Sequence, residues 1–346
     1  MPMLMRIILI AVGLYVTGSA LWLLAGGVVP DSGGTELLNV SYDPTRELYR
    51  DLNQAFVARF EKERGVRLTI KQSHGGSGSQ ARAVIDGLDA DVVTLALHSD
   101  IDAIRGKGLI DDGWENRFPD RALPYYSTIV FVVRAGNPKN IHDWPDLTGQ
   151  GVQVITPNPK TSGNGRLSLW AAWGAVRYRG GSEQEALEYV ARLYRNVPVL
   201  DSGARGSTVT FAQRHLGDVH LSWENEAQLE VQESAGKLQI IYPPISLKAE
   251  PPVAIVDANV KRKGTRAAAE AYLKWLYTTE AQDIIARNFY RPSKEDVLKR
   301  HASTFPAITL YPITTVAASW EEAQSRFCAE GGIFDQIYGG KPRWRP

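Results

Sequence analysis

This sequence has almost no excess of positive over negative charge, and it contains a single cysteine. Its 346 residues carry 39 Lys and Arg against 38 Asp and Glu, a formal net charge of +1, and no run of basic residues appears. This balance argues against nucleic acid as a partner. The single cysteine, Cys328, excludes an internal disulfide and a cysteine-based metal cluster. We expect Cys328 to be free and structural.

Patterns typical of enzymes are also missing. No loop carries the Gly-x-x-x-x-Gly-Lys-Ser/Thr pattern of phosphate-binding loops, and no Gly-x-Ser-x-Gly elbow accompanies an assured histidine. The histidines at 74, 98, 142, 215, 220 and 301 form no His-x-x-x-His pair, which argues against zinc hydrolysis. Glu224 and Glu226 lie two apart and suggest no acid/base pair. We expect no metal, no cofactor and no catalysis; an anion-processing hydrolase is the enzymatic alternative.

The N-terminus has the features of an export signal. Arg6 precedes a charge-free apolar run over residues 7–29, followed by a polar linker. The run approaches the roughly 20 residues that span a bilayer. It has no clean Ala-x-Ala cleavage site, and the lack of a nearby cysteine excludes a lipoprotein anchor. Residues 1–35 are therefore predicted to be a signal or anchor segment with its linker, and both cleavage and retention stay open.

Strand-like and helix-like segments alternate beyond residue 36. Apolar runs at 37–41, 66–70 and 91–97 predict strands, and 48–60 keeps a helical period. Asp43 is expected to cap that helix, with Pro44 at its first position. The β-α-β-α-β order favours a parallel sheet with helices on its faces.

A long strand at 127–134 looks like a crossover into a second α/β set, which begins at 152–156. We expect two α/β lobes joined by more than one crossing, with a small ligand in the cleft between them. The predicted division is 36–128 for the first part of lobe 1, 129–250 for lobe 2, and 251–346 for the return to lobe 1 and the C-terminal helices.

Three loops rich in small residues each stand between a strand and a helix, at 72–80, 158–166 and 200–208. A helix start presents unpaired N–H groups and the positive end of a dipole, and so favours an anion. In open α/β sheets such starts gather at the carboxyl ends of the strands. Together the loops predict an oxyanion site; the alternative for any one of them is a flexible Gly/Ser turn.

Several stretches of the chain together form a recognisable set. They are Gln-Ser-His-Gly-Gly-Ser-Gly at 72–78, Trp-Glu-Asn-Glu-Ala at 223–227, and the segments 38–49, 90–97, 154–160, 200–208 and 288–292. In these stretches the chain resembles the sulfate-binding proteins of bacterial ABC transporters. The resemblance runs from about 36 to 337. It implies a two-lobed periplasmic-binding-protein fold of type II in the α/β class. It also implies capture of sulfate or thiosulfate in the periplasm by a monomer, and delivery to an ABC permease in the inner membrane.

Carried over by position, the resemblance implies an anion held by uncharged donors. These are the backbone N–H of Ser77, the N–H and hydroxyl of Ser162, the N–H groups of Gly163, Asn164 and Ala204, and the indole N–H of Trp223. Asn164 stands where the family often has glycine, so a glycine-only backbone angle there would be strained. The alternative for Trp223 is an ordinary core residue.

Charged neighbours are expected to support the donors without touching the anion. The charged residues expected in this supporting role are Asp43, Arg166 and Arg205, and the uncharged Gly78 is expected to share it. The arginines should hydrogen-bond loop carbonyls or pair with Asp43. Direct pairing of an arginine with the anion is an alternative, as is His74 as a ligand rather than a structural residue. We expect Lys160 to be solvated and Asp201 to cap or brace its loop. Other oxyanions such as molybdate or phosphate, and a membrane-tethered anion sensor, remain alternative functions.

Overall fold

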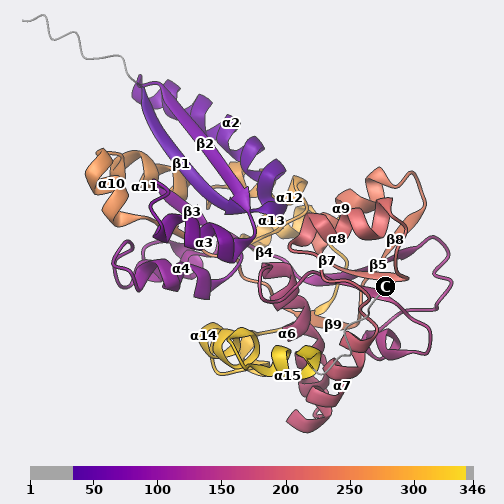
Figure 1. Cartoon of the computed structure of the whole chain (residues 1–346). Coiled ribbons are helices and arrows are strands. Elements are labelled where there is room, and N and C mark those ends of the chain that lie inside the picture. The colour runs from indigo at the N-terminus through magenta and orange to yellow at the C-terminus, as the bar shows by residue number, and fades with distance from the viewer. Residues whose placement is uncertain (1–33, 340–346) are drawn as a thin grey trace, which may run out of the picture.

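Two four-stranded sheets with helices on their faces form the two lobes of the protein (Figure 1). The computed structural model describes residues 34–339. Of the predicted signal or anchor segment with its linker, 1–35, all but the last two residues lie outside the described residues, and Thr35 already belongs to a strand. The first sheet has the order β10-β3-β1-β2. Its strands are β1 (Thr35–Tyr42), β2 (Leu68–Gly75), β3 (Val92–Thr94) and β10 (Val253–Ile255). β1 is parallel to β2 and β3, whereas β10 returns antiparallel beside β3.

The second sheet has the order β6-β7-β5-β8. Its strands are β5 (Ile129–Arg134), β6 (Val154–Ile155), β7 (Val219–Trp223) and β8 (Leu238–Ile241). β5 runs antiparallel to both of its neighbours. Two further strand pairs form separate two-stranded sheets: β4 (Tyr125–Tyr126) with β11 (Arg291–Pro292), and β9 (Ile245–Leu247) with β12 (Thr309–Tyr311).

Helices of the first lobe surround its sheet, and most of them contribute to one apolar core with it. They are η1 (Asp43–Thr45), α2 (Arg46–Arg64), α3 (Ser77–Ile85), α4 (His98–Arg105), η2 (Trp114–Asn116), α5 (Pro119–Ala122), α10 (Asp257–Lys263), α11 (Arg266–Trp275), α12 (Thr279–Arg287) and α13 (Glu295–Arg300). In α2, buried Leu48, Leu52 and Phe56 recur every four residues and so face the core together. The helix ends at Gly65, which takes the left-handed conformation.

The second lobe is built around one almost fully enclosed helix, α6 (Gly163–Tyr178). The other helices of this lobe are η3 (Trp144–Thr148), α7 (Glu183–Arg195), α8 (Ala204–Thr208) with its π-helical continuation η4 (Val209–Gln213), and α9 (Glu224–Glu233). Residues 163–175 of α6 are all buried. A side chain at Gly174 would overlap the ring of Tyr311, with its Cβ 2.4 Å from Cε2, so glycine permits this close approach.

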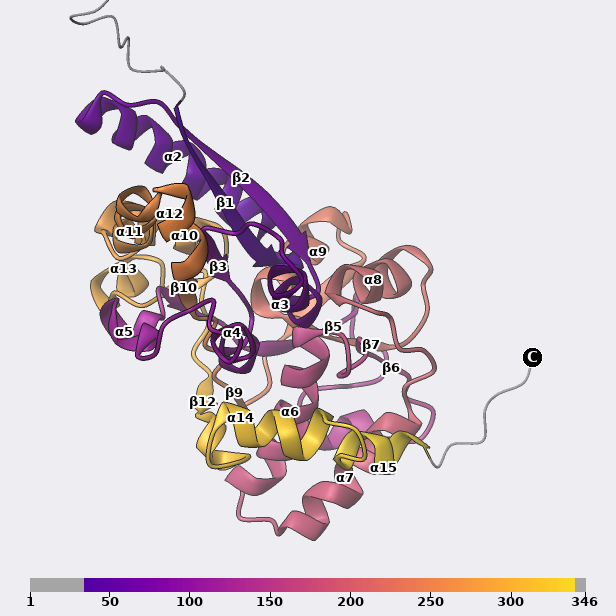
Figure 2. The same ribbon diagram turned by 60° about the vertical axis from the view of Figure 1, so that its left-hand side comes forward.

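The C-terminal segment packs on the second lobe. It contains η5 (Ile313–Thr315), α14 (Trp320–Ala323), η6 (Gln324–Cys328) and α15 (Ile333–Gly339), which lie along α6 and α7 in both ribbon views (Figure 2). Phe327 meets Trp173 edge-to-face with centroids 4.8 Å apart. Cys328 is free and buried, and burial raises the pKa of its thiol to about 12. The division of the chain at 128 and 250 stays a proposal.

Two local predictions differ from the structure. Asp43 does not cap the helix: it begins the turn η1 after Tyr42 and makes no capping bond. Its carboxylate instead accepts from Arg46 at 2.9 Å. The second strand starts at Leu68 rather than Val66, whose side chain is 45% exposed. Among the helices of residues 34–339, none is long and apolar enough to span a bilayer.

We predict that a chain beginning at Gly34 folds without the preceding residues. The described sheets and helices all start at or after Thr35, and within residues 34–339 the two large apolar cores are complete assemblies of residues from Leu37 onward. The shortened chain should show one cooperative thermal transition and bind its ligand as tightly as the full chain does, measured by calorimetry. Aggregation of the shortened chain, or loss of binding, would contradict this.

Candidate functional site

A small hollow lies where the two lobes meet. The volume open to the centre of a water-sized sphere is about 10 Å³. A hollow of this size has room for one small species and not for a larger molecule. Residues of both lobes line it: Tyr42, Asp43, Pro44, Gly75, Gly76 and Ser77 from the first, and Ser162, Gly163, Asn164, Gly203, Ala204 and Trp223 from the second. The structure thus brings all six residues of the predicted donor set to one place.

Backbone N–H groups at three helix starts border the hollow. Ser77 is the first residue of α3, Gly163 and Asn164 are the first two of α6, and Ala204 is the first of α8. Because a first-turn N–H has no carbonyl one turn earlier in its own helix, it is left to bond something outside the helix. The positive ends of these helices favour a negative charge in the hollow.

Trp223 adds a side-chain donor. It ends β7 directly before α9, and its side chain is fully buried against the ring of Tyr42, with centroids 5.4 Å apart. Its indole N–H finds no acceptor within residues 34–339. A buried donor without a partner costs about 1–3 kcal/mol, which an oxygen atom in the hollow would relieve.

Ser162 departs from the prediction in one of its two donors. Its backbone N–H donates to the carbonyl of Asn158 at 2.9 Å, so the expected N–H contact with the anion is wrong. Its hydroxyl oxygen accepts the N–H of Gly165 at 3.4 Å. That bond leaves the hydroxyl hydrogen available, and Ser162 retains one donor for the hollow.

Asn164 takes its position without the strain that we expected. It has ordinary helical geometry and is absent from the residues with positive φ, so glycine is not required there. Its buried side-chain amide donates to the carbonyl of Leu221 at 3.2 Å and accepts from Ser168 at 3.4 Å. The side chain therefore ties α6 to β7, two residues before Trp223, and leaves the backbone N–H for the hollow.

A buried ion pair joins the two lobes next to Ser77. Arg166, on α6, donates to the two carboxylate oxygens of Asp100, on α4, at 2.9 and 3.1 Å. The side chains of the pair are only 4% and 8% exposed. The Ser77 hydroxyl also donates to Asp100, at 2.5 Å, and accepts the Ala96 N–H at 3.0 Å. A Cβ at Gly78 would lie 3.1 Å from Arg166 Nη2, so glycine gives the guanidinium its room.

Arg205 makes a second link between the lobes. Its guanidinium lies 2.8 Å from Glu47 of α2 and 2.8 Å from Glu226 of α9. Burial raises the pKa of Glu226 to about 8, although the charge of Arg205 opposes that rise. Neither Arg166 nor Arg205 pairs with Asp43, so this part of the prediction is wrong; Arg46 fills that role. Both predicted arginines have carboxylate partners of their own.

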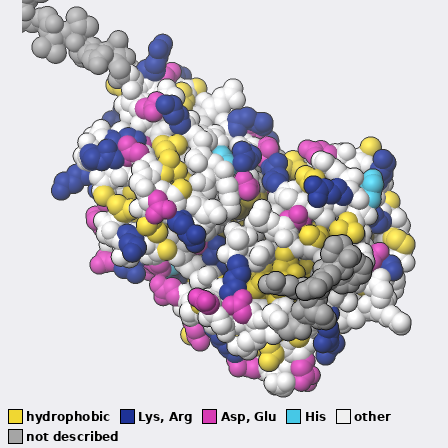
Figure 3. Space-filling model, viewed as in Figure 1, with side chains coloured by type: hydrophobic (Ala, Val, Ile, Leu, Met, Phe, Trp, Pro, Cys, Tyr) yellow, Lys and Arg dark blue, Asp and Glu magenta, His cyan; other side chains and the backbone are white. Residues whose placement is uncertain are grey.

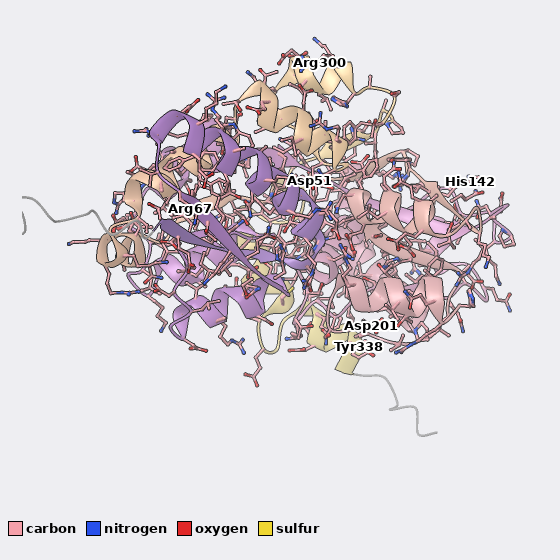
Figure 4. All side chains as sticks on the ribbon, turned by 90° about the horizontal axis from the view of Figure 1, so that it is seen from above. Asp51, Arg67, His142, Asp201, Arg300 and Tyr338 are labelled. Atoms are coloured by element: carbon pink, nitrogen blue, oxygen red, sulfur yellow. The ribbon has the colours of Figure 1, made fainter. Side chains whose placement is uncertain are left out.

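The remaining loop residues keep clear of the hollow. His74 does not line it, and burial together with the charge of Arg46 lowers the pKa of His74 to about 4. Asp201, labelled in Figure 4, accepts from Thr210 at 3.1 Å and so braces its loop. Lys160 is not simply solvated: it pairs with Asp335 at 2.7 Å and donates to the Ala329 carbonyl at 2.8 Å.

A larger cleft, of about 570 Å³, opens between α4 and α14 and contains none of the predicted donors. Much of its charged lining is paired internally: His98 lies 2.9 Å from both Asp102 and Glu115, and Arg105 bridges Asp102 and Asp112. Across the described range 34–339, no cluster of three or more His, Cys, Asp or Glu could hold a metal ion. The hollow between the lobes is the better candidate site, because it is bordered by helix starts and by the buried indole N–H of Trp223, which has no acceptor among residues 34–339.

Two lobes that enclose a donor-lined hollow define a solute-binding protein of the periplasmic type. The model of the family described as bacterial extracellular solute-binding protein matches residues 45–291. A sulfate-binding protein of Salmonella typhimurium is 54% identical over 304 residues, covering 87% of this chain and 92% of that protein. A thiosulfate-binding protein of Pseudomonas aeruginosa is 48% identical with the same coverage.

The fold comparison agrees. The sulfate-binding protein SubI of Mycobacterium tuberculosis H37Rv superposes with a TM-score of 0.76 at 31% identity, over 85% of this chain and 99% of its own. A ferric-ion-binding protein of Pasteurella haemolytica, at 15% identity, shares the fold with a TM-score of 0.63. The chain belongs to the bacterial extracellular solute-binding proteins, in the group of sulfate- and thiosulfate-binding proteins. It is a transport component rather than an enzyme, which sets the hydrolase alternative aside.

Removal of the Arg166 side chain tests the buried pair. Arg166→Met leaves the Asp100 carboxylate buried without its partner, so the free energy of unfolding should fall by about 3–5 kcal/mol. Arg46→Met breaks an exposed pair of the same type and should cost about 0–1 kcal/mol. Urea unfolding of the two variants measures both values; equal losses would show that the Asp100 contact is not the stabilising feature proposed here.

Proposed function

We propose that this protein captures sulfate outside the cytoplasm and delivers it to the permease of an ABC transporter. The observation that carries the proposal is the buried indole N–H of Trp223, which has no partner among residues 34–339 and lines a small hollow bordered by helix starts. The names of the similar proteins support sulfate or thiosulfate as the ligand class. In this proposal the anion contacts the N–H groups of Ser77, Gly163, Asn164 and Ala204, the Ser162 hydroxyl and the Trp223 indole.

The chemistry of the donors favours sulfate over phosphate. Sulfate is fully deprotonated near neutral pH and has only oxygens to offer, so each of its bonds needs a donor. Hydrogen bonds to a charged acceptor contribute about 1.5–3 kcal/mol each, and several in fixed positions offset the desolvation of a dianion. Phosphate near neutral pH also carries a proton, and this proton needs an acceptor in the site rather than a donor. Among residues 34–339, Asp43 is the one carboxylate that lines the hollow, and one of its oxygens already accepts from Arg46.

The small size of the hollow and its position between the two lobes indicate how the ligand is bound and released. A hollow that fits one small ion and is formed by both lobes can open only when the lobes separate, as in other hinged binding proteins. We infer that the protein acts as a monomer, is exported by its apolar N-terminal run, and releases the anion when the permease draws the lobes apart.

Substituting Trp223 by Phe tests its role as a donor. Trp223→Phe keeps an aromatic ring in the core but removes the indole N–H, so sulfate affinity should fall about tenfold or more, as expected when about 1.4 kcal/mol is lost. Trp170→Phe is the matched control: that indole is also buried and partnerless but does not line the hollow. Affinities are measured by titration calorimetry. If both variants bind sulfate with wild-type affinity, Trp223 does not contact the anion.

The pH dependence of affinity tests the uncharged site as a whole. None of the six proposed contacts titrates between pH 5 and 8, and the pKa of His74, lowered to about 4, keeps this side chain neutral throughout that range. Sulfate affinity should therefore be nearly flat there, and sulfate should outcompete phosphate at pH 7. The measurement is calorimetric competition among sulfate, thiosulfate, phosphate and molybdate. Equal affinity for sulfate and phosphate, or a steep rise in sulfate affinity below pH 6.5, would contradict the proposal.

A further inference from the structure

One end of the first lobe carries exposed charge and an exposed apolar side chain. We name residues 62–67, which are the end of α2 and its link to β2, the apex; all six are exposed. The described chain also begins here, because the Thr35 N–H donates to the Arg67 carbonyl at 2.9 Å. Arg67 is labelled in Figure 4, and Figure 3 shows Lys and Arg side chains at this end of the lobe.

The basic side chains of the apex are not neutralised. Within residues 34–339, no carboxylate forms an ion pair with Lys62, Arg64 or Arg67, whereas Glu63 pairs with Arg59 at 2.9 Å. Val66 lies between the two arginines and is 45% exposed, a rare state for a large apolar side chain in this protein. The apex therefore combines basic side chains with an apolar one, a combination that fits the headgroup region of an anionic bilayer.

An apolar run that precedes β1 could hold this end of the lobe close to a bilayer. Residues 7–29 are charge-free and apolar over a length that can span a membrane. Only residues 30–34 separate that run from β1. Five residues reach at most about 18 Å when fully extended. If the run stays in the membrane, the end of the lobe nearest to the lipid must be the apex.

We propose that the N-terminal run is retained as an anchor and that the apex rests on anionic phospholipid headgroups. Lys62, Arg64 and Arg67 contact the lipid phosphates, and Val66 enters the boundary between headgroups and acyl chains. The anion site is not covered by this contact. It lies at the other end of β1, whose eight residues extend about 26 Å at the usual rise of a strand.

A fluorescent label at the apex tests the contact in the full chain. Val66→Cys is labelled with an environment-sensitive dye, since the native Cys328 is buried. The protein is reconstituted into vesicles of phosphatidylcholine alone or mixed with phosphatidylglycerol. We expect a blue shift only with phosphatidylglycerol, reversed by high salt. The same label at Tyr178→Cys, also exposed but on α6 of the second lobe, should not shift.

Charge reversal identifies the residues responsible. A triple variant is made in the labelled Val66→Cys chain: Lys62→Glu, Arg64→Glu and Arg67→Glu. In this variant, the ratio of lipid-bound to unbound apex should fall about tenfold or more. Arg195→Glu, Arg214→Glu and Lys237→Glu make the same change in net charge at exposed positions of the second lobe and should leave the shift intact.

Two results would overturn the proposal. One is a dye signal that does not distinguish the two vesicle types or that survives reversal at the apex. The other is recovery of the protein from cells in the soluble fraction, with an intact mass that lacks residues 1–30. Retention of the full-length mass in carbonate-washed membranes is the expected outcome. None of these measurements depends on which anion the protein binds.

Discussion

A doubly charged anion can leave water for a closed hollow only if fixed donors replace its hydration shell. Charged side chains could supply the attraction, but each would itself have to be desolvated. In this protein the cations nearest the hollow have carboxylate partners: Arg166 with Asp100, Arg205 with Glu47 and Glu226, and Arg46 with Asp43. Apart from the Asp43 carboxylate, the polar groups that border the hollow include N–H and O–H donors, and three helices begin at its edge.

This requirement explains why the two lobes fit so closely. A Cβ at Gly163 would lie 2.8 Å from the Cβ of Ala96 across the interface, and one at Gly76 would lie 3.0 Å from the Thr161 carbonyl. The buried Asp100–Arg166 pair holds α4 against α6 and also receives the Ser77 hydroxyl. Donors from both lobes therefore take up their positions together. Opening the lobes would break these contacts and expose the anion to water at the same time.

Local features of the fold and site could be predicted from sequence, whereas long-range pairings could not. The three small-residue loops and the strands before them are short-range patterns, and their residues Ser77, Gly163 and Ala204 do line one hollow. Asp100 was missed, because nothing near it in sequence indicates a partner 66 residues away. The Ser162 N–H was misassigned, since its bond to Asn158 depends on how tightly that loop turns. The packing of α14 and α15 on the second lobe likewise depends on contacts distant in sequence.

The most direct test of the uncharged site is a crystal structure of the protein grown with selenate, whose anomalous signal locates the anion. We expect one tetrahedral anion in the hollow, with oxygens within about 3.2 Å of the Trp223 indole nitrogen and the backbone nitrogens of Ser77 and Ala204. Arg166 should remain on Asp100. An anion bound instead to a lysine, arginine or histidine side chain, or an empty hollow with the anion in the larger cleft, would contradict a site made of uncharged donors.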